Sequence, residues 1–474
     1  MRVLLIYPPY SLHEIYDKLE AIGNTSPPLG IGYIAAVLEK AGHVVKVIDA
    51  PTLSYKLKDI LRELEDFRPE AVGLTCLTPD FSKSIALAEA IKKISQRPII
   101  IGGPHVTAAP AETIRHDCFD FGVIGEGEDT IVELINFLEH RAPTSLFEIR
   151  GLIFREGERI IRTPPRPFIS DLDKIPFPAR HLMPTFDQYH PTPASYKHLP
   201  LGTLVTSRGC PFHCVYCDRA IFGNMYRFRS AKNVVDEIEL LVKKYGAREL
   251  RLWDDTFNAQ ISRVIEICQE IVRRGIKVTW TCLGRVNFVT DDLIKWMKRA
   301  GCWQISFGIE SGDDEVLKKI KKGQTKEMVR KAFKICQRQK MGTRGFFIIG
   351  LPGDTEETMQ ATIDFAKELP LDVAGFYVTI PFPGTELTDT AKKTGELLMS
   401  EHDQCMYDQF LVNLPDKLFY VPNGLSETVI RKYQKRAYHE FYMRPRYILK
   451  QFLQIQSLKE LLNKIKAFFV IREI

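Results

Sequence analysis

The chain has 474 residues, a formal net charge of +6 and ten cysteines. This length is too great for one ordinary hydrophobic core and predicts about three domains. The charge excess is too small to indicate a nucleic-acid-binding protein, and the cysteines, apart from one group of three, are too scattered for a disulfide framework.

The N-terminal stretch Met1–Pro8 is apolar but has neither the length nor the cleavage site of a signal peptide. No run of eighteen apolar residues occurs along the sequence, so no membrane-spanning helix is predicted. We therefore expect a cytoplasmic protein in a reducing environment.

Residues 1–142 alternate short β-branched runs with helical patterns. Helices are predicted at Leu29–Lys40 and Phe81–Ser95, and strands at Val3–Tyr7, Val44–Asp49, Ala71–Thr75, Pro98–Gly102 and Phe121–Gly125. This alternation is typical of an α/β fold, a doubly wound parallel sheet with helices on both faces. Ligands of such a sheet bind at the C-terminal ends of its strands.

Residues 143–200 form a connecting segment. It contains a predicted hairpin at 151–163, followed by nine prolines between 164 and 200. Proline at this density excludes a helix or a central strand. We expect this segment to cross between two domains and to be ordered by packing.

Residues 201–390 resume the alternation with six βα units. Their strands are predicted near Thr203–Ser207, Glu249–Trp253, Lys277–Thr281, Gln304–Ile309, Arg344–Ile349 and Gly375–Ile380. Six units are too few for a closed eight-unit barrel. Beyond this part, residues 391–474 are predicted to be a helical C-terminal region.

Cys210, Cys214 and Cys217 stand together in the run Thr206-Ser-Arg-Gly-Cys-Pro-Phe-His-Cys-Val-Tyr-Cys217. A cubane iron–sulfur cluster that only carries electrons takes four thiolates, so three ligands leave one iron open to a substrate. A zinc site or a disulfide is the alternative. Zinc sites usually add a second cysteine pair or nearby histidines, and here only His213 lies in the loop. The loop therefore predicts a [4Fe-4S] cluster with an open iron.

The spacing of three residues and then two, with Tyr216 before the last cysteine, resembles the radical S-adenosylmethionine (SAM) enzymes. In that family the open iron chelates the amino and carboxylate groups of SAM, and the aromatic residue packs near its adenine. The resemblance also implies a partial (β/α)6 barrel whose first strand precedes the cluster loop. The first strand predicted above has this position.

The resemblance extends to later strand ends. Asp254 and Asp255 stand where the family places groups near the methionine amino group, although many members have Gly-Gly-Glu there. Arg285 is expected to pair with the SAM carboxylate, with a surface ion pair as the alternative. Glu310 resembles the residue that meets the ribose or methionine of SAM. Gly350 lies in a loop that resembles the one flanking adenine.

Small residues follow three strands of the first domain, in the runs Thr75-Cys-Leu77, Gly102-Gly103-Pro-His and Gly125-Glu126-Gly. The first strand runs into two prolines and not into a glycine-rich turn, so no pyrophosphate cradle is predicted. The runs resemble the cobalamin-binding domain, which pairs a Ser-x-Leu motif with a Gly-Gly motif. Thr75, Leu77, Gly102, Gly103 and Glu126 are therefore expected to bind cobalamin. The alternative is a fold that packs without a cofactor.

One motif of cobalamin-binding proteins is missing. The first loop lacks Asp-x-His-x-x-Gly, and neither His13 nor His105 is expected to be a cobalt ligand; His105 is expected to be structural or to contact the nucleotide tail. Cobalamin-dependent radical SAM enzymes commonly lack this axial histidine as well.

The chain as a whole thus resembles the cobalamin-dependent radical SAM enzymes. The resemblance implies a methyltransferase that acts on an unactivated carbon of a small or lipidic substrate through a 5′-deoxyadenosyl radical and methylcobalamin. A non-methylating cyclase or oxidative enzyme and a non-enzymatic accessory protein that carries the cluster and the corrin are the alternatives. The tRNA methylthiotransferases are disfavoured, since they have three more cysteines in the N-terminal domain and this chain has only Cys76 and Cys118 there.

The same family resemblance also predicts the partners of the protein. We expect an external electron donor of the flavodoxin or ferredoxin type and no nucleic acid. The tail is basic and aromatic, and a solvated helix face is expected there, with peripheral membrane contact as the alternative. Its basic residues are Arg431, Lys432, Lys435, Arg436, Arg444, Arg446, Lys450, Lys459, Lys464 and Lys466.

Overall fold

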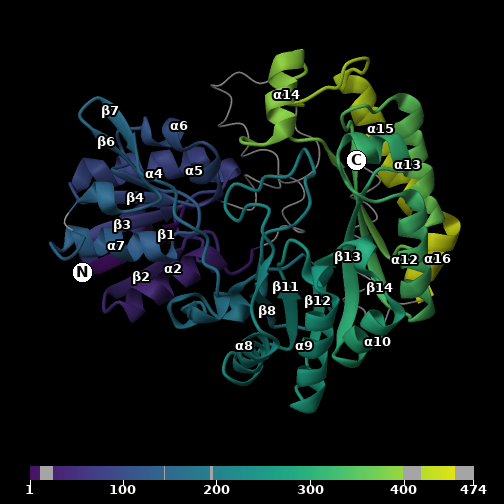
Figure 1. Cartoon of the computed structure of the whole chain (residues 1–474), viewed down its shortest axis with the longest axis horizontal. Coiled ribbons are helices and arrows are strands. Elements are labelled where there is room, and N and C mark those ends of the chain that lie inside the picture. Colours follow the sequence, from purple (N-terminus) through teal and green to yellow (C-terminus); the bar gives the residue numbers. More distant parts are fainter. Residues whose placement is uncertain (11–24, 144, 193–195, 399–417, 454–474) are drawn as a thin grey trace.

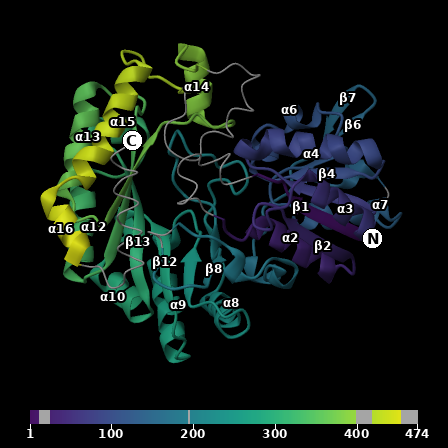
Figure 2. The same ribbon diagram turned by 180° about the vertical axis from the view of Figure 1, so that it is seen from behind.

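A computed structural model describes residues 1–10, 25–143, 145–192, 196–398 and 418–453, with side chains as far as 449. Two lobes lie side by side, each built on its own sheet (Figure 1). Seen from behind, the helices α15 (Glu427–Tyr442) and α16 (Pro445–Leu453) run along the outside of the second lobe (Figure 2). None of the helices in these described ranges is long and apolar enough to cross a bilayer.

The first lobe contains a seven-stranded sheet in the order β2-β1-β3-β4-β5-β6-β7. Its strands are β1 (Arg2–Tyr7), β2 (Val44–Asp49), β3 (Ala71–Thr75), β4 (Ile99–Gly102), β5 (Phe121–Val123), β6 (Leu152–Glu156) and β7 (Arg159–Arg162). The first five are parallel, and the hairpin β6–β7, which the sequence placed in the connecting segment, completes the edge. The strand order reverses between β1 and β3, the point where such sheets bind ligands.

Alternate residues of β1 enter two different cores, which shows that both faces of the sheet are covered. Val3 and Leu5 pack with the helices α2 (Leu29–Lys40) and α7 (Glu128–Leu138). Leu4 and Ile6 pack with α3 (Leu57–Phe67) and α4 (Phe81–Ile94). The period of two residues along a strand explains this division.

The second lobe contains six parallel strands in the order of the chain. They are β8 (Leu201–Leu204), β11 (Glu249–Leu252), β12 (Thr279–Gly284), β13 (Cys302–Glu310), β14 (Gly342–Ile349) and β15 (Val373–Val378). The helices that follow successive strands cover one face: α8 (Ala231–Lys243), α9 (Ile261–Arg273), α10 (Asp291–Arg299), α12 (Lys326–Arg338) and α13 (Glu356–Glu368). The predicted partial barrel has this topology.

The first strand of this sheet is displaced from its predicted position. It ends at Leu204, and Ser207–Arg208 form a separate short strand, β9, antiparallel to β10 (Arg227–Phe228). The backbone N–H groups of Thr206 and Ser207 donate to the carboxylate of Asp254 at 2.6 and 2.5 Å. Because the carboxylate takes these donors, they cannot continue the parallel ladder.

The C-terminal helix α15 packs against α13 and against β15, the edge strand of the second sheet. The Tyr442 hydroxyl accepts from the backbone of Ala374 at 3.1 Å, and the Tyr438 hydroxyl accepts from that of Phe376 at 3.3 Å. Two basic residues of the tail form ion pairs within α15: Arg431 with Glu427, and Arg436 with Glu440. Lys459, Lys464 and Lys466 lie outside the described residues.

Candidate functional site

The three neighbouring cysteines lie in the loop between β9 and β10, and none of them forms a disulfide. Burial raises the pKa of the Cys217 thiol to about 12, and the nearby Cys214 and Cys210 add to the rise, so the three sulfur atoms lie near one another. In the described part of the chain, no three ligating side chains converge on a single ion. A cubane cluster does not require this, since it binds each thiolate to a different iron. The loop therefore fits a cluster, whose positive irons would reverse the rise in pKa.

The two aspartates after β11 differ in their surroundings. Asp254 is buried, and besides two backbone N–H groups it accepts from the hydroxyls of Thr206 and Ser207 at 2.8 and 3.0 Å. It was expected at the methionine amino group, but the structure uses it to shape the start of the cluster loop. Asp255 is exposed beside that loop, and its charge raises the pKa of Cys217. Asp255 is thus the carboxylate of the pair that is open to an ammonium group.

Glu310 ends β13 with a backbone φ of +69°, a left-handed conformation that is rare outside glycine and costs about 1–3 kcal/mol. Its buried carboxylate accepts from the Lys322 ammonium at 2.6 Å, and Lys322 also lies 3.3 Å from the Tyr216 hydroxyl. Nearby, the amide nitrogen of Gln324 donates to the carbonyls of Gly308 and Ile309, while its amide oxygen is buried and unpaired among the described residues. An unpaired buried acceptor beside a buried ion pair is the kind of site that a polar ligand completes.

Lys322 and Gln324 were not identified from the sequence. They lie in the turn after the helix α11 (Asp314–Lys319), where no motif marks them. Their positions relative to Glu310 depend on how this turn folds back over β13.

Arg285 follows β12 and is buried against the cluster loop. Its guanidinium lies over the Phe212 ring at 3.5 Å from the ring centre, donates to the Lys322 carbonyl and lies 3.7 Å from the Cys214 sulfur. This burial is contrary to the surface ion pair considered from the sequence. A buried cation therefore lies next to one of the three cysteines of the loop.

Gly350 begins the loop after β14 with a φ of +80°, a conformation that favours glycine. A Cβ at this position would lie 3.1 Å from Ile430 of α15. The expected adenine loop therefore packs directly against the C-terminal helix. In the same loop, burial raises the pKa of Asp354 to about 6, and this side chain accepts from the Leu351 backbone at 2.7 Å.

The residues expected to bind cobalamin meet at the C-terminal ends of β3 and β4. Thr75 pairs with Gly102 in the sheet, and Gly103 has a φ of +112°. A Cβ on Gly103 would lie 2.7 Å from the Cys76 carbonyl and 3.3 Å from the Thr75 hydroxyl. Leu77 is exposed beside them. The glycine at 103 is thus required by the close approach of Cys76 and Thr75, and the exposed Leu77 side chain is open to a ligand at this C-terminal edge of the sheet, so the edge fits the cofactor.

His105 is fully buried in the first lobe. Its ring packs on Phe81 with the ring centres 4.0 Å apart, its Nδ1 lies 3.3 Å from the Thr78 hydroxyl, and burial lowers its pKa to about 4. These contacts agree with a structural histidine. His13, considered with it from the sequence, lies outside the described residues.

Glu126 was expected to contact the corrin, but the structure pairs it with the second lobe. Its two carboxylate oxygens accept from Arg208 and Arg227, each at 2.7 Å. Arg208 also donates to Glu128 at 2.5 Å, and all four side chains are at most 7% exposed. Although burial disfavours its charge, Glu128 and Glu126 raise the pKa of Arg208. We call these four residues the junction network.

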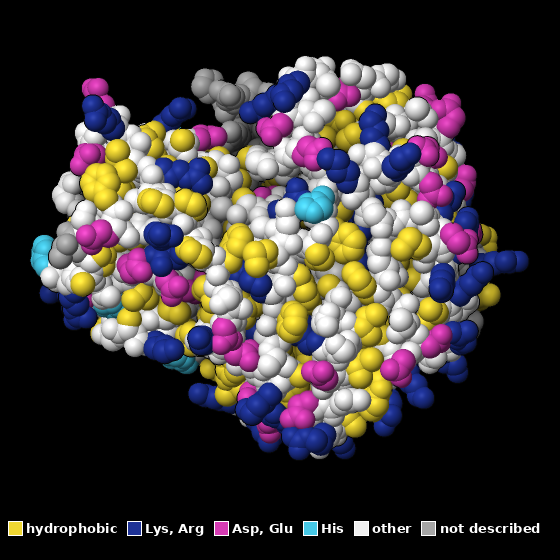
Figure 3. All heavy atoms as spheres, in the orientation of Figure 1, with side chains coloured by type: hydrophobic (Ala, Val, Ile, Leu, Met, Phe, Trp, Pro, Cys, Tyr) yellow, Lys and Arg dark blue, Asp and Glu magenta, His cyan; other side chains and the backbone are white. Residues whose placement is uncertain are grey.

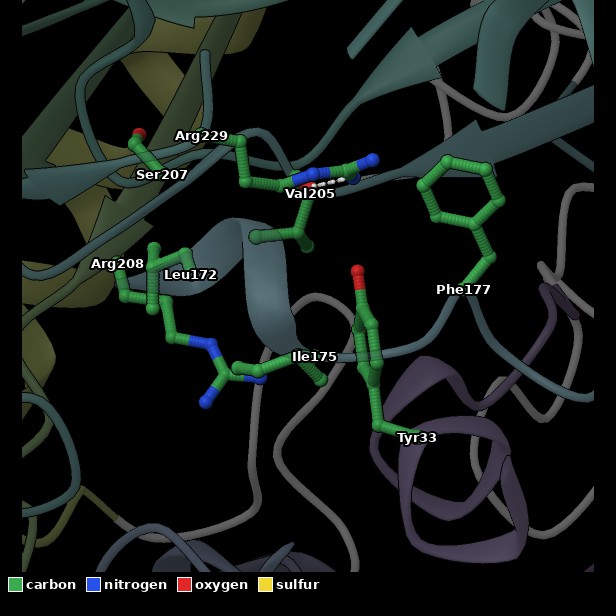
Figure 4. A pocket seen from close by; sticks show the side chains of 8 residues that line it. All are labelled: Tyr33, Leu172, Ile175, Phe177, Val205, Ser207, Arg208 and Arg229. Atoms are coloured by element: carbon green, nitrogen blue, oxygen red, sulfur yellow. Dashed lines mark hydrogen bonds between the residues drawn. The ribbon is translucent and has the colours of Figure 1, made fainter. Parts of the chain in front are cut away.

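A small pocket lies beside the junction network (Figure 4). Tyr33 of α2 reaches into it from the first lobe, and Arg229 from the second lobe donates to the Val205 carbonyl at 2.9 Å. Its lining residues are Tyr33, Leu172, Ile175, Phe177, Val205, Ser207, Arg208 and Arg229. The connecting segment therefore packs into the contact between the lobes. Arg208, two residues before Cys210, links the loop after β5 to the cluster loop.

Comparison with known families agrees with this two-site arrangement. The radical SAM superfamily matches residues 204–366, and the B12 binding domain matches residues 19–135. The fold and the site together thus define an enzyme with a corrin site beside a cluster and SAM site.

The chain is also similar to individual proteins. An uncharacterized methyltransferase, PH0819, of Pyrococcus horikoshii is 35% identical over 457 residues, which are 96% of this chain and 95% of that protein. The anaerobic magnesium-protoporphyrin IX monomethyl ester cyclase of Cereibacter sphaeroides is 30% identical and covers 82% of this chain and 63% of that protein. The methyltransferase TsrM of Kitasatospora setae, solved with cobalamin and a [4Fe-4S] cluster, shares the fold with a TM-score of 0.71 at 20% identity, covering 94% of this chain and 89% of that one. The chain belongs to the cobalamin-dependent radical SAM enzymes.

Replacing Lys322 by Ala is expected to weaken SAM binding at least about tenfold, because Glu310 would remain as a buried carboxylate without its partner. Equilibrium dialysis of labelled SAM against the reconstituted protein measures this. Lys322→Arg should restore part of the affinity. Lys321→Ala is the matched control, since that side chain is exposed and pairs with Glu386 at the surface. Unchanged SAM affinity in Lys322→Ala would contradict the assignment.

Proposed function

We propose that the protein is a methyltransferase that places a methyl group on an unactivated carbon of a small or lipidic substrate. The observation that carries this proposal is the similarity to a methyltransferase over 96% of the chain. The junction network supports it, since it joins the first lobe to the strand that ends two residues before Cys210. When bound, the cofactors would supply a 5′-deoxyadenosyl radical that takes hydrogen from the carbon and a methyl group that a second SAM loses as it becomes S-adenosylhomocysteine.

The chain's own residues would hold these cofactors. Cys210, Cys214 and Cys217 would bind the cluster. Asp255 would accept from the SAM ammonium, and the pair of Glu310 and Lys322 would offer both an acceptor and a donor to its polar groups. The backbone of the Gly350 loop would flank adenine, and Thr75, Leu77, Gly102 and Gly103 would line the cobalamin site. Arg285 would hold the loop in place through its contacts with Phe212 and Cys214.

The similarity to the porphyrin ester cyclase favours one second candidate, a reaction that uses the same two cofactors without methyl transfer. The residues described above serve both reactions equally, since they hold cofactors and not substrate. The distinction therefore depends on what happens to the SAM methyl group.

The test is to reconstitute the protein without oxygen, load it with cobalamin, and add reductant and methyl-labelled SAM. Methyl transfer predicts 5′-deoxyadenosine, S-adenosylhomocysteine and label on the corrin, all measured by mass spectrometry. If 5′-deoxyadenosine forms without label on the corrin, the cyclase-like reaction is favoured. If neither nucleoside forms in a protein with a full cluster, the enzyme assignment of this site fails and an accessory role replaces it.

The proposal includes two further partners. An external electron donor of the flavodoxin or ferredoxin type belongs to the proposal because reductive cleavage of SAM consumes an electron, which a donor outside the chain would supply. Membrane contact through the basic tail stays a prediction. On the face shown in Figure 3, basic and acidic side chains are interspersed among the described residues of both lobes.

A further inference from the structure

A buried hydroxyl next to the cluster loop has no role so far. Thr256 follows the two aspartates after β11 and is 1% exposed, and its Oγ1 lies 3.3 Å from the sulfur of Cys210. The other two sulfurs have neighbours of a different kind. Cys214 lies 3.7 Å from the Arg285 guanidinium, and Cys217 lies 3.8 Å from a backbone carbonyl. Each sulfur of the loop thus has its own polar neighbour, and that of Cys210 is a neutral hydroxyl.

The backbone on both sides of Thr256 is anchored. Asp254, two residues earlier, holds the start of the cluster loop through the hydrogen bonds described above. The Thr256 carbonyl accepts from the Ala259 backbone at 3.3 Å and so begins the short 3-10 turn Phe257–Ala259. Phe257 is fully buried, with its ring centre 5.6 Å from that of Trp280. The Thr256 side chain is therefore held beside the cluster loop.

The cluster loop is anchored on both sides of Cys210 as well. Gly209 has a φ of +82°, and a Cβ at this position would collide with the Met225 carbonyl just before β10. Further along the loop, the backbone N–H of Val215 donates to the Ile320 carbonyl at 3.1 Å. The contact between Thr256 and Cys210 therefore joins two segments whose positions are fixed independently.

The Thr256 hydroxyl has one proton and two neighbours that can accept it. One is the Asp255 carbonyl at 2.8 Å, and the other is the Cys210 sulfur at 3.3 Å. While Cys210 is a thiol, its own proton can go to Oγ1 and the hydroxyl proton to the carbonyl. A sulfur that binds iron has no proton and carries negative charge, so it can only accept. Since hydrogen bonds to a charged acceptor are about twice as strong as neutral ones, we expect the hydroxyl to turn to the sulfur.

A hydrogen bond to a ligand sulfur changes how readily an iron–sulfur cluster is reduced. Reduction adds negative charge, and part of this charge is carried by the sulfur atoms. The positive end of the hydroxyl dipole therefore stabilises the reduced state more than the oxidised state, which raises the reduction potential.

We propose that Thr256 raises the reduction potential of the cluster by donating a hydrogen bond to the Cys210 thiolate. Thr256 acts through Cys210 and is a positioning residue, which makes it easier for an external donor to reduce the cluster. This inference rests on the proposed function of the three cysteines as cluster ligands.

Replacing Thr256 by Val tests the proposal, because valine has the shape of threonine without the hydroxyl. The protein is loaded with cluster and cobalamin, kept free of SAM, and poised at a series of potentials while the EPR signal of the reduced cluster is followed. At a fixed applied potential, the ratio of reduced to oxidised cluster should fall roughly threefold to tenfold, where tenfold corresponds to about 59 mV for a one-electron couple. Thr256→Ser keeps the hydroxyl and should retain the potential of the unmodified protein.

Thr343→Val is the matched control. Thr343 is also buried, and its hydroxyl donates to the Pro370 carbonyl at 3.2 Å, but it lies at the start of β14, at the opposite end of the sheet from the cluster loop. Only variants with the iron content of the unmodified protein are compared, and Thr256→Ala replaces Thr256→Val if the latter binds less iron.

Two results would overturn the proposal. One is a hydroxyl-free variant that has its full iron and the same potential as Thr343→Val. The other is a serine variant whose potential falls as far as that of the valine variant. Either result leaves the iron content unchanged, so it refutes the role of Thr256 without refuting the cysteines as cluster ligands. If the unmodified protein binds no iron on reconstitution, the function of the loop fails and this inference fails with it.

Discussion

Replacing Cys214 by Ala is expected to abolish the cluster and, with it, all formation of 5′-deoxyadenosine. Two thiolates cannot hold a cubane cluster in place, and Cys214 is the ligand that lies buried against Arg285. Iron analysis after reconstitution should fall from about four atoms per chain to near zero. Nucleoside products measured by mass spectrometry should fall to the level without enzyme.

Cys268→Ala provides the control. Cys268 is buried in the helix α9 of the same lobe, and burial raises the pKa of its thiol, which is the behaviour of a core residue. Its removal should cost about 1 kcal/mol of stability and leave the cluster intact. A Cys214→Ala protein that still binds four irons and cleaves SAM would refute the assignment of the loop.

Replacing Arg208 by Gln is expected to lower the free energy of unfolding by about 3–5 kcal/mol, because Glu128 would be left buried without its partner. Glu126 would keep Arg227. Since Glu126 lies in the loop after β5 and Glu128 begins the helix α7, we also expect the variant to retain less cobalamin. Urea denaturation followed by tryptophan fluorescence measures the first effect, and the corrin absorbance after gel filtration measures the second.

The comparison variant for Arg208 is Arg330→Gln. Arg330 pairs with Glu368 at 2.6 Å, but both side chains are partly exposed, so its loss should cost less than about 1 kcal/mol. If Arg208→Gln is as stable as Arg330→Gln and retains cobalamin fully, the junction network does not hold the two lobes together.

Local patterns predicted most of the fold. The strands of both sheets are short β-branched runs, and a run such as Ala71–Thr75 is marked by its own residues. The cluster loop was found for the same reason, since its three cysteines lie within eight positions of one another. β8 was misplaced because its end depends on Asp254, a residue 48 positions beyond Thr206.

The parts of the site that were missed depend on contacts between distant segments. Glu126 was predicted to be a residue of the corrin loop. It pairs with Arg208, which lies 82 positions later in the sequence, so this contact could not be predicted from a local pattern. Lys322 lies in no motif. Its role depends on its contact with Glu310, which has a left-handed backbone conformation. Position along the sequence therefore predicted which loops meet at the site but not which side chains pair there.

The tyrosines of α15 have a consequence for how the enzyme can be divided. Tyr438 and Tyr442 bind the outer backbone of β15, which would otherwise be an open sheet edge ready to pair with another chain. A catalytic fragment cut where the βα alternation stops, near residue 390, would expose that edge. The shortest fragment expected to be an active catalyst therefore extends at least through Tyr442. The helix α15 is as much a part of the barrel as its strands are.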